Sequence, residues 1–106
     1  MNSARPAEVV IDTRVDPAGW PIVTVSGELD ISNADSLEET VRAITAARPE
    51  RLTFELSGLR FMDSAGIAVL VGAATMVGAV HLRDPSPTVR RVLELTGLSS
   101  VMPIEP

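Results

Sequence analysis

The sequence predicts an α/β (α+β) fold, a single mixed sheet of four to five strands with helices packed mainly on one face. The 106 residues fit one domain, and 45% of them are apolar, which is enough for a buried core. Only 3% are aromatic, so that core is aliphatic. Short β-branched segments alternate along the chain with longer segments of helical periodicity. This order is typical of helices layered on a sheet.

The N-terminal part predicts a β-hairpin followed by a helix. Two segments rich in β-branched residues, 8–15 and 22–26, flank the turn residues Asp16-Pro17-Ala18-Gly19. Next, Ser32-Asn33-Ala34-Asp35 has the pattern of a capping box, with an aspartate in place of the usual glutamate. Apolar residues then recur at helical spacing, which predicts a helix over 34–47 that ends before a proline.

The remaining sequence predicts further strands and helices in alternation. Strands are expected at residues 52–56, 79–82 and 101–104, the last of them at a sheet edge. Residues 65–76 predict a helix that is apolar on nearly all sides. A third helix is expected to begin at Pro87, because Ser86 is a good N-cap, and to end at Gly97.

Composition excludes several classes of function. A formal net charge of −5 disfavours direct binding to nucleic acid or to an anionic membrane, and the one tight basic pair is Arg90-Arg91. No apolar run reaches the roughly 18 residues of a membrane-spanning helix. With no cysteine, disulfides, thiolate catalysis and cysteine-based zinc sites are excluded. We expect a cytoplasmic protein without cofactor or metal, whose residues 1–7 form a short flexible N-terminus.

The most informative chemistry lies at Asp63-Ser64, where a strand and loop give way to the apolar helix. Ser64 can be read as an N-cap that stabilises the helix by about 1 kcal/mol. It can also be read as a phosphorylation site, because a phosphate would lie at the positive end of the helix dipole. A nucleophilic role is a poorer interpretation, since it needs a base and the only histidine, His81, falls in the middle of a predicted strand.

A second acidic segment, Gly27-Glu28-Leu29-Asp30, follows the second predicted strand. Its simplest interpretation is a solvated turn that helps the next helix to begin. As a metal site the pair Glu28 and Asp30 is weak, because no third ligand stands at a recognisable spacing. The segment gains meaning only together with the Asp63-Ser64 motif.

Three blocks in this order resemble the bacterial anti-sigma factor antagonists of the STAS family. They are GELD at residues 27–30, FMDSAG at 61–66 followed by IAVLVG, and SPTVRRVLELTGL at 86–98. The resemblance covers roughly residues 9–104, and the middle block is the most specific. It implies one STAS-like domain over residues 8–106.

The resemblance also implies a partner-switching cycle rather than an enzyme. In such proteins the unphosphorylated form binds an anti-sigma factor, a small ATP-binding serine kinase, and so releases a sigma factor. Phosphorylation at the position of Ser64 ends the binding, and a phosphatase restores it. The same match places Asp30, Asp63, Ala65 and Gly66 with Ser64 on the partner-binding surface.

The sequence departs from the family pattern in two places. The segment 72–78 is short and uncharged, whereas the same segment in relatives is often longer and more basic. The identity of the cognate kinase therefore does not follow from the resemblance. Relatives also often continue into a final helix, so we expect an uncovered apolar surface near residues 101–104 that favours self-association, in a monomer or weak homodimer. The main rival function is a STAS-like scaffold or transport-complex subunit whose Ser64 is never phosphorylated. A serine hydrolase is disfavoured because the chain has no nucleophile elbow.

Overall fold

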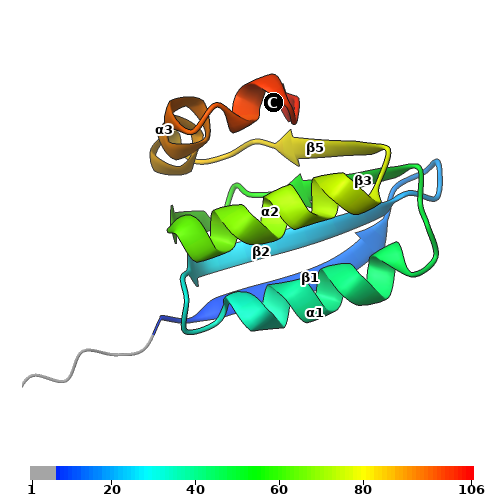
Figure 1. The fold of residues 1–106 in the computed structure, drawn as a ribbon, viewed down its shortest axis with the longest axis horizontal. Helices are drawn as coiled ribbons and strands as arrows, with labels where there is room; N and C mark the ends of the chain where they lie inside the picture. Colours follow the sequence, from blue (N-terminus) through cyan, green and yellow to red (C-terminus); the bar gives the residue numbers. More distant parts are fainter. Residues whose placement is uncertain (1–6) are drawn as a thin grey trace, which may run out of the picture.

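The computed structural model describes residues 7–106, which form one mixed sheet covered on one face by two helices (Figure 1). In chain order the elements are β1 (Val9–Val15), β2 (Pro21–Leu29), α1 (Ala34–Thr45), β3 (Arg51–Glu55), β4 (Leu59–Met62), α2 (Ser64–Met76), β5 (Ala79–Arg83), α3 (Pro87–Leu95), a 3-10 turn (Leu98–Ser100) and β6 (Ile104–Glu105). The predicted fold class is confirmed. The expected flexible N-terminus lies, except for Ala7, outside the described residues.

The sheet has six strands, so the expected four to five are too few. The strand that the sequence did not separate from its loop is β4. Its four residues alternate poorly, because Arg60 and Phe61 in the middle are both exposed. The partner strand β2 runs on to Leu29 rather than ending at residue 26. Its first half pairs in parallel with β3 and its last three residues pair in parallel with β4.

The order of neighbouring strands is β1-β2-β3-β5-β6, which puts β1 and β6 at the two edges. The hairpin of β1 and β2 is the only antiparallel pair among the described strands. Asp16 closes its turn by accepting hydrogen bonds from the amides of Ala18 and Trp20, each at 2.9 Å. Gly19 takes a φ of 89°, the left-handed conformation expected of glycine in such a turn.

The three helices pack in two different places. α1 and α2 pack side by side on one face of the sheet (Figure 1). α3 packs against β4, and its expected cap is confirmed: Ser86 Oγ accepts from the amide of Val89 at 3.4 Å and donates to the carbonyl of Leu59 at 2.8 Å. Gly97, with a φ of 78°, follows the end of α3 as predicted.

The last strand is shorter and later than expected, at residues 104–105 instead of 101–104. The carboxylate of Glu105 joins this strand to residues of β3 and β5. Glu105 accepts a hydrogen bond from Arg51 at 2.9 Å, and its carboxylate lies 2.8 Å from Nδ1 of His81. The expected apolar surface here is mostly covered, since Met102 is fully buried and Ile104 packs on the core, which leaves Val101 exposed.

The core between the sheet and the helices is aliphatic, with one buried phenylalanine, Phe54. Its buried members include side chains from the four inner strands, β2 to β5, and from all three helices. The edge strands β1 and β6 add partly buried side chains that pack against it. Within residues 7–106, no helix is both long enough and apolar enough to span a membrane.

Candidate functional site

The acidic segment and the serine motif meet because β2 and β4 are parallel neighbours. Leu29 and Met62, the last residues of the two strands, are paired in register. The amide of Asp63 donates to the carbonyl of Leu29 at 3.2 Å, which joins the two strand ends just beyond the pair. Asp30 and Asp63 therefore leave the same end of the sheet side by side.

The residue that caps α2 is Asp63, so the expectation that Ser64 is the cap is wrong. Asp63 has an extended backbone, and its Oδ1 accepts from the amides of Ala65 at 2.9 Å and Gly66 at 3.4 Å. Both residue types are good N-caps, and here the aspartate stands one position earlier, outside the helix. Ser64 becomes the first helical residue.

Ser64 is exposed, and its hydroxyl has no hydrogen-bond partner within residues 7–106. A capping serine would instead turn its oxygen towards the helix amides. Because Asp63 already accepts from these amides, the hydroxyl of Ser64 is free to point outward. The site thus offers one accessible hydroxyl at the positive end of a helix of 13 residues.

Asp30 begins the connection to α1 and organises it. Its Oδ1 accepts from the amide of Ser32 at 2.8 Å and from the Ser32 hydroxyl. Asn33 accepts from the amide of Asp30 and donates to the carbonyl of Glu28 at 2.9 Å. The expected capping box is absent at this helix start, since Asn33 is the N-cap residue and makes no side-chain cap hydrogen bond. The side chains that shape this turn thus bond to the strand end and to the turn itself.

Gly66, in the first turn of α2, is buried on the side of the helix that faces the strands. A Cβ at this position would come within 2.6 Å of the Met62 side chain and 2.7 Å of Leu29. The glycine therefore lets the first turn of α2 approach the ends of β4 and β2. This close approach determines how near Ser64 lies to the ends of the two strands. Because Gly66 itself is buried, it cannot belong to an exposed partner-binding surface. Ala65 is half-buried beside it.

A shallow hollow of about 200 Å³ lies between the first turns of α1 and α2. Ile31, Asp35 and Ala65 contribute to its lining, and Ile31 is 83% exposed. Phe61, on β4 two positions before Asp63, is another exposed apolar side chain and does not line this hollow. Neither residue was predicted as part of the site from the sequence, where the available signal is an apolar side chain directly after Asp30 and another two positions before Asp63.

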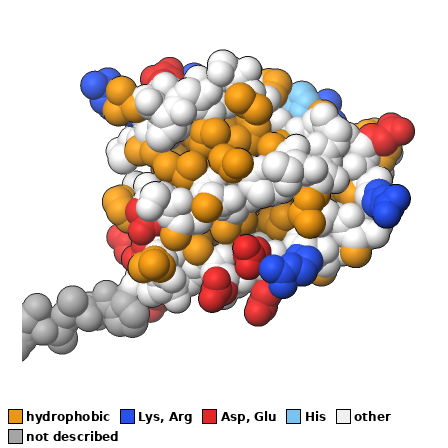
Figure 2. All heavy atoms as spheres, viewed as in Figure 1, with side chains coloured by type: hydrophobic (Ala, Val, Ile, Leu, Met, Phe, Trp, Pro, Cys, Tyr) orange, Lys and Arg blue, Asp and Glu red, His pale blue; other side chains and the backbone are white. Residues whose placement is uncertain are grey.

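The surface of α2 continues this uncharged character along the molecule. No acidic or basic residue occurs from Ser64 to Met76, whereas α1 carries several. Figure 2 shows hydrophobic side chains over the middle and upper part of this face and charged side chains gathered over α1 below. The site therefore combines two carboxylates at one end with an uncharged helix beside them.

Catalytic and metal chemistry find little support at this site. His81 lies on β5 beside Glu105, so it is engaged with the edge strand and not with Ser64. No group of three or more histidine or acidic residues within residues 7–106 has the geometry of a metal site.

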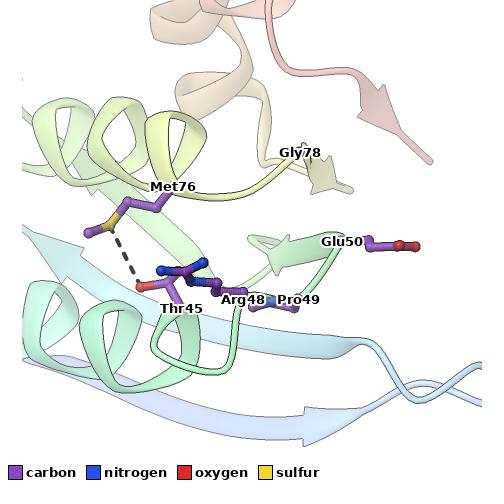
Figure 3. Close-up of a pocket in the computed structure, with 6 residues that line it drawn as sticks. All are labelled: Thr45, Arg48, Pro49, Glu50, Met76 and Gly78. Carbon is purple, nitrogen blue, oxygen red and sulfur yellow. Dashed lines mark hydrogen bonds between the residues drawn. The ribbon is translucent and has the colours of Figure 1, made fainter.

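A larger hollow lies at the opposite end of α2 (Figure 3). It is open, about 490 Å³ in volume, and it includes Thr45, Arg48 and Met76 in its lining. The hydroxyl of Thr45 lies 3.6 Å from the sulfur of Met76, while Glu50 points away from both (Figure 3). Its described lining holds neither an acidic cluster nor a free nucleophile, and it is remote from the motif residues.

The STAS domain model matches residues 8–106 of the chain, nearly its whole length. The chain belongs to the STAS domain family. It is 35% identical over 91 residues to the anti-sigma F factor antagonist of Paenibacillus polymyxa, in an alignment that covers 81% of this chain and 78% of the relative.

Solved structures of anti-sigma factor antagonists have the same fold. An anti-sigma factor antagonist from Mycobacterium paratuberculosis superposes with a TM-score of 0.86 at 30% identity, covering 93% of this chain and 86% of that one. The Bacillus protein SpoIIAA has been solved in an unphosphorylated and a phosphorylated form, with TM-scores of 0.75 and 0.71 at 23% and 22% identity. These alignments cover 90% of this chain in each case and 87% and 90% of SpoIIAA, and they show the shared fold.

Proposed function

We propose that this STAS protein is an anti-sigma factor antagonist whose binding is switched off by phosphorylation of Ser64. The unphosphorylated protein binds an anti-sigma factor that is itself a serine kinase, and so releases a sigma factor. The kinase transfers phosphate to Ser64, the complex separates, and a phosphatase restores the free hydroxyl. In this cycle the protein is the substrate and the ligand, and it performs no catalysis of its own.

The observation that carries the proposal is that Asp63, and not Ser64, caps α2. Asp63 caps α2 through its bonds to the amides of Ala65 and Gly66. Ser64 is thereby exposed at the helix start without a structural bond of its own within the described residues. A kinase can therefore reach and modify this hydroxyl without breaking a contact of the fold.

Charge explains why a phosphate at this position would end binding. A phosphoserine carries about −1.5 to −2 charges at neutral pH. The amides that would otherwise hold it at the helix N-terminus already donate to Asp63. The new dianion would therefore stand beside Asp63 and Asp30 with little local compensation. A partner surface that accepts a neutral hydroxyl would then face a concentrated negative charge.

The apolar surroundings of Ser64 support a protein partner. The hollow beside Ile31 and Ala65 can receive an apolar side chain of the partner. Buried apolar contacts of this kind commonly dominate the energy of an interface. Asp30 and Asp63 at its rim would pair with basic residues of the partner, which favours correct orientation.

Mapping of the phosphorylation site tests the proposal. The purified protein is incubated with ATP and each anti-sigma-type serine kinase of its own cell, and the modified residue is located by mass spectrometry. We expect a single phosphate on Ser64, none in Ser64→Ala, and wild-type modification in the matched control Ser36→Ala, an exposed serine on α1. Modification elsewhere, or by none of these kinases, would contradict the proposal and favour the scaffold function.

A further inference from the structure

The strand β1 forms one edge of the sheet, and half of its backbone polar groups face away from the molecule. In an antiparallel ladder, alternate residue pairs exchange both of their hydrogen bonds, while the pairs between them point outward. The amide of Asp16 donates to Trp20, and that of Glu28 donates to Glu8, so the even-numbered residues of β1 bond to β2. The outward groups belong to the odd-numbered residues, among them Ile11, Thr13 and Val15.

This edge is open along its second half. Asp12, Thr13, Arg14 and Val15 are all exposed, so α1 does not cover them. Val15 is an apolar side chain with 67% of its surface exposed. Within residues 7–106, neither Asp12 nor Arg14 has a salt-bridge partner. A long exposed edge strand with apolar residues is a template for pairing with another strand.

The charges on β1 are self-complementary when two copies pair antiparallel about Thr13, because Asp12 of each then faces Arg14 of the other. Moving the two-fold axis by one residue in either direction would put Asp12 opposite Asp12, or Arg14 opposite Arg14. Opposite charges across a strand pair stabilise it by roughly 0.2–1 kcal/mol and like charges destabilise it. The charges therefore favour the axis at Thr13 over either neighbouring residue.

Backbone hydrogen bonding is compatible with this register, as it is with an axis at either neighbouring residue. Pairing about Thr13 sets odd residues opposite odd residues, so that the outward amides and carbonyls meet one another. Asp12 and Arg14 then occupy a pair without backbone hydrogen bonds, in which side chains lie closest. On the other face, Ile11 lies opposite the exposed Val15 of the second copy. Charge thus selects the axis at Thr13, and both backbone hydrogen bonding and apolar contact are compatible with it.

We propose that β1 pairs antiparallel with β1 of a second copy of this chain, centred on Thr13, to form a two-fold dimer with one continuous sheet. Thr13 pairs with Val23, in the middle of β2, and is thus six β2 residues away from Leu29. At about 3.3 Å per residue this separation is roughly 20 Å, which leaves both Ser64 surfaces free. The dimer would present two partner-binding sites, and it does not depend on the function proposed for Ser64.

Charge reversal tests this interface. Sedimentation equilibrium of the full chain from 10 µM to 1 mM is expected to show a monomer–dimer equilibrium for the wild type. Asp12→Arg alone and Arg14→Asp alone should each raise the dimer dissociation constant at least tenfold. An equimolar mixture of the two variants should form a heterodimer, because two arginines then face two aspartates. The double variant Asp12→Arg/Arg14→Asp should return to within threefold of the wild type.

Controls separate the interface from the fold and from the partner switch. All variants should melt within a few degrees of the wild type, since both positions are exposed. Ser64→Asp should dimerise as the wild type does. A wild type that remains monomeric at 1 mM would overturn the proposal. So would a dimer that the single reversals leave intact, or a mixture that fails to associate.

Discussion

The amide of Asp63 donates to the carbonyl of Leu29 at 3.2 Å, and this bond ties the end of β4 to the end of β2. It brings Asp30 and Asp63, which are 33 positions apart in the sequence, to the same end of the sheet. From there Asp63 caps α2 and leaves Ser64 outside. The functional proposal depends on this geometry, so the first predictions concern the residues that create it.

The identity of the cap can be tested by comparing two adjacent substitutions. Asp63→Ala removes the acceptor for two helix amides and should lower the free energy of unfolding by about 1 kcal/mol. For a domain of this size that loss corresponds to a melting temperature lower by about 4–8 °C. Ser64→Ala should stay within about 0.5 kcal/mol of the wild type, because its hydroxyl makes no hydrogen bond within residues 7–106. Calorimetry of both variants checks this.

Asp63→Asn is the matched control, since asparagine caps as well as aspartate but carries no charge. It should recover most of the stability lost in Asp63→Ala. A larger loss of stability in Ser64→Ala than in Asp63→Ala would show that serine is the cap after all.

Gly66, on the side of α2 that faces the strand ends, gives a second prediction. In Gly66→Ala the new methyl group would press on Leu29 and Met62, and overpacking of this kind costs about 1–3 kcal/mol. The control is Gly72→Ala on the same helix, where a Cβ meets no atom within 4 Å. That change should raise stability by about 0.5–1 kcal/mol, because alanine is the better helix former.

Urea denaturation of the two glycine variants measures both effects on one scale. Equal responses at the two positions would mean that α2 does not approach the strand ends closely at Gly66. The position of Ser64 relative to the strand ends would then depend on other contacts.

Sequence reasoning predicted the fold class, both hairpin strands and all three helices, since each has a strong local signal. The caps at Ser86 and Gly97 were predictable for the same reason. β4 was missed because its exposed Arg60 and Phe61 hide the alternation, and its pairing with the end of β2 is a non-local contact. The choice between Asp63 and Ser64 as cap depends on one position of backbone geometry, and two adjacent good N-caps give no local signal to decide it.

The apolar anchor proposed at Ile31 can be tested by binding. Ile31→Ser should weaken the complex with the anti-sigma factor at least tenfold and leave the melting temperature unchanged, because its side chain is 83% exposed in the free protein. The control is Met76→Gln, whose side chain is 56% exposed but which lies at the end of α2, about 18 Å along the helix from Ser64 at 1.5 Å per residue. Titration calorimetry should show wild-type affinity for this control. If both variants bind alike, Ile31 is not part of the interface.

Charge at Ser64, rather than the loss of its hydroxyl, should control partner affinity. Ser64→Ala is expected to bind the anti-sigma factor at all times, whereas Ser64→Asp and Ser64→Glu bind poorly because they add an anion beside Asp63. A carboxylate at this position carries less charge than a phosphate, so the effect of either acidic substitution should be smaller than that of phosphorylation. Affinities of the three variants that agree within experimental error would contradict an electrostatic switch.

The most direct test of the account uses one sample of the protein phosphorylated at Ser64, with a binding titration and a melting curve measured side by side. Affinity for the anti-sigma factor should fall more than a hundredfold, a loss of about 3 kcal/mol. The melting temperature should stay within a few degrees of the unmodified protein, because Asp63 continues to cap α2. Undiminished binding, or a melting temperature lower by about 15 °C or more, which is several kcal/mol of lost stability, would contradict a local switch at Ser64.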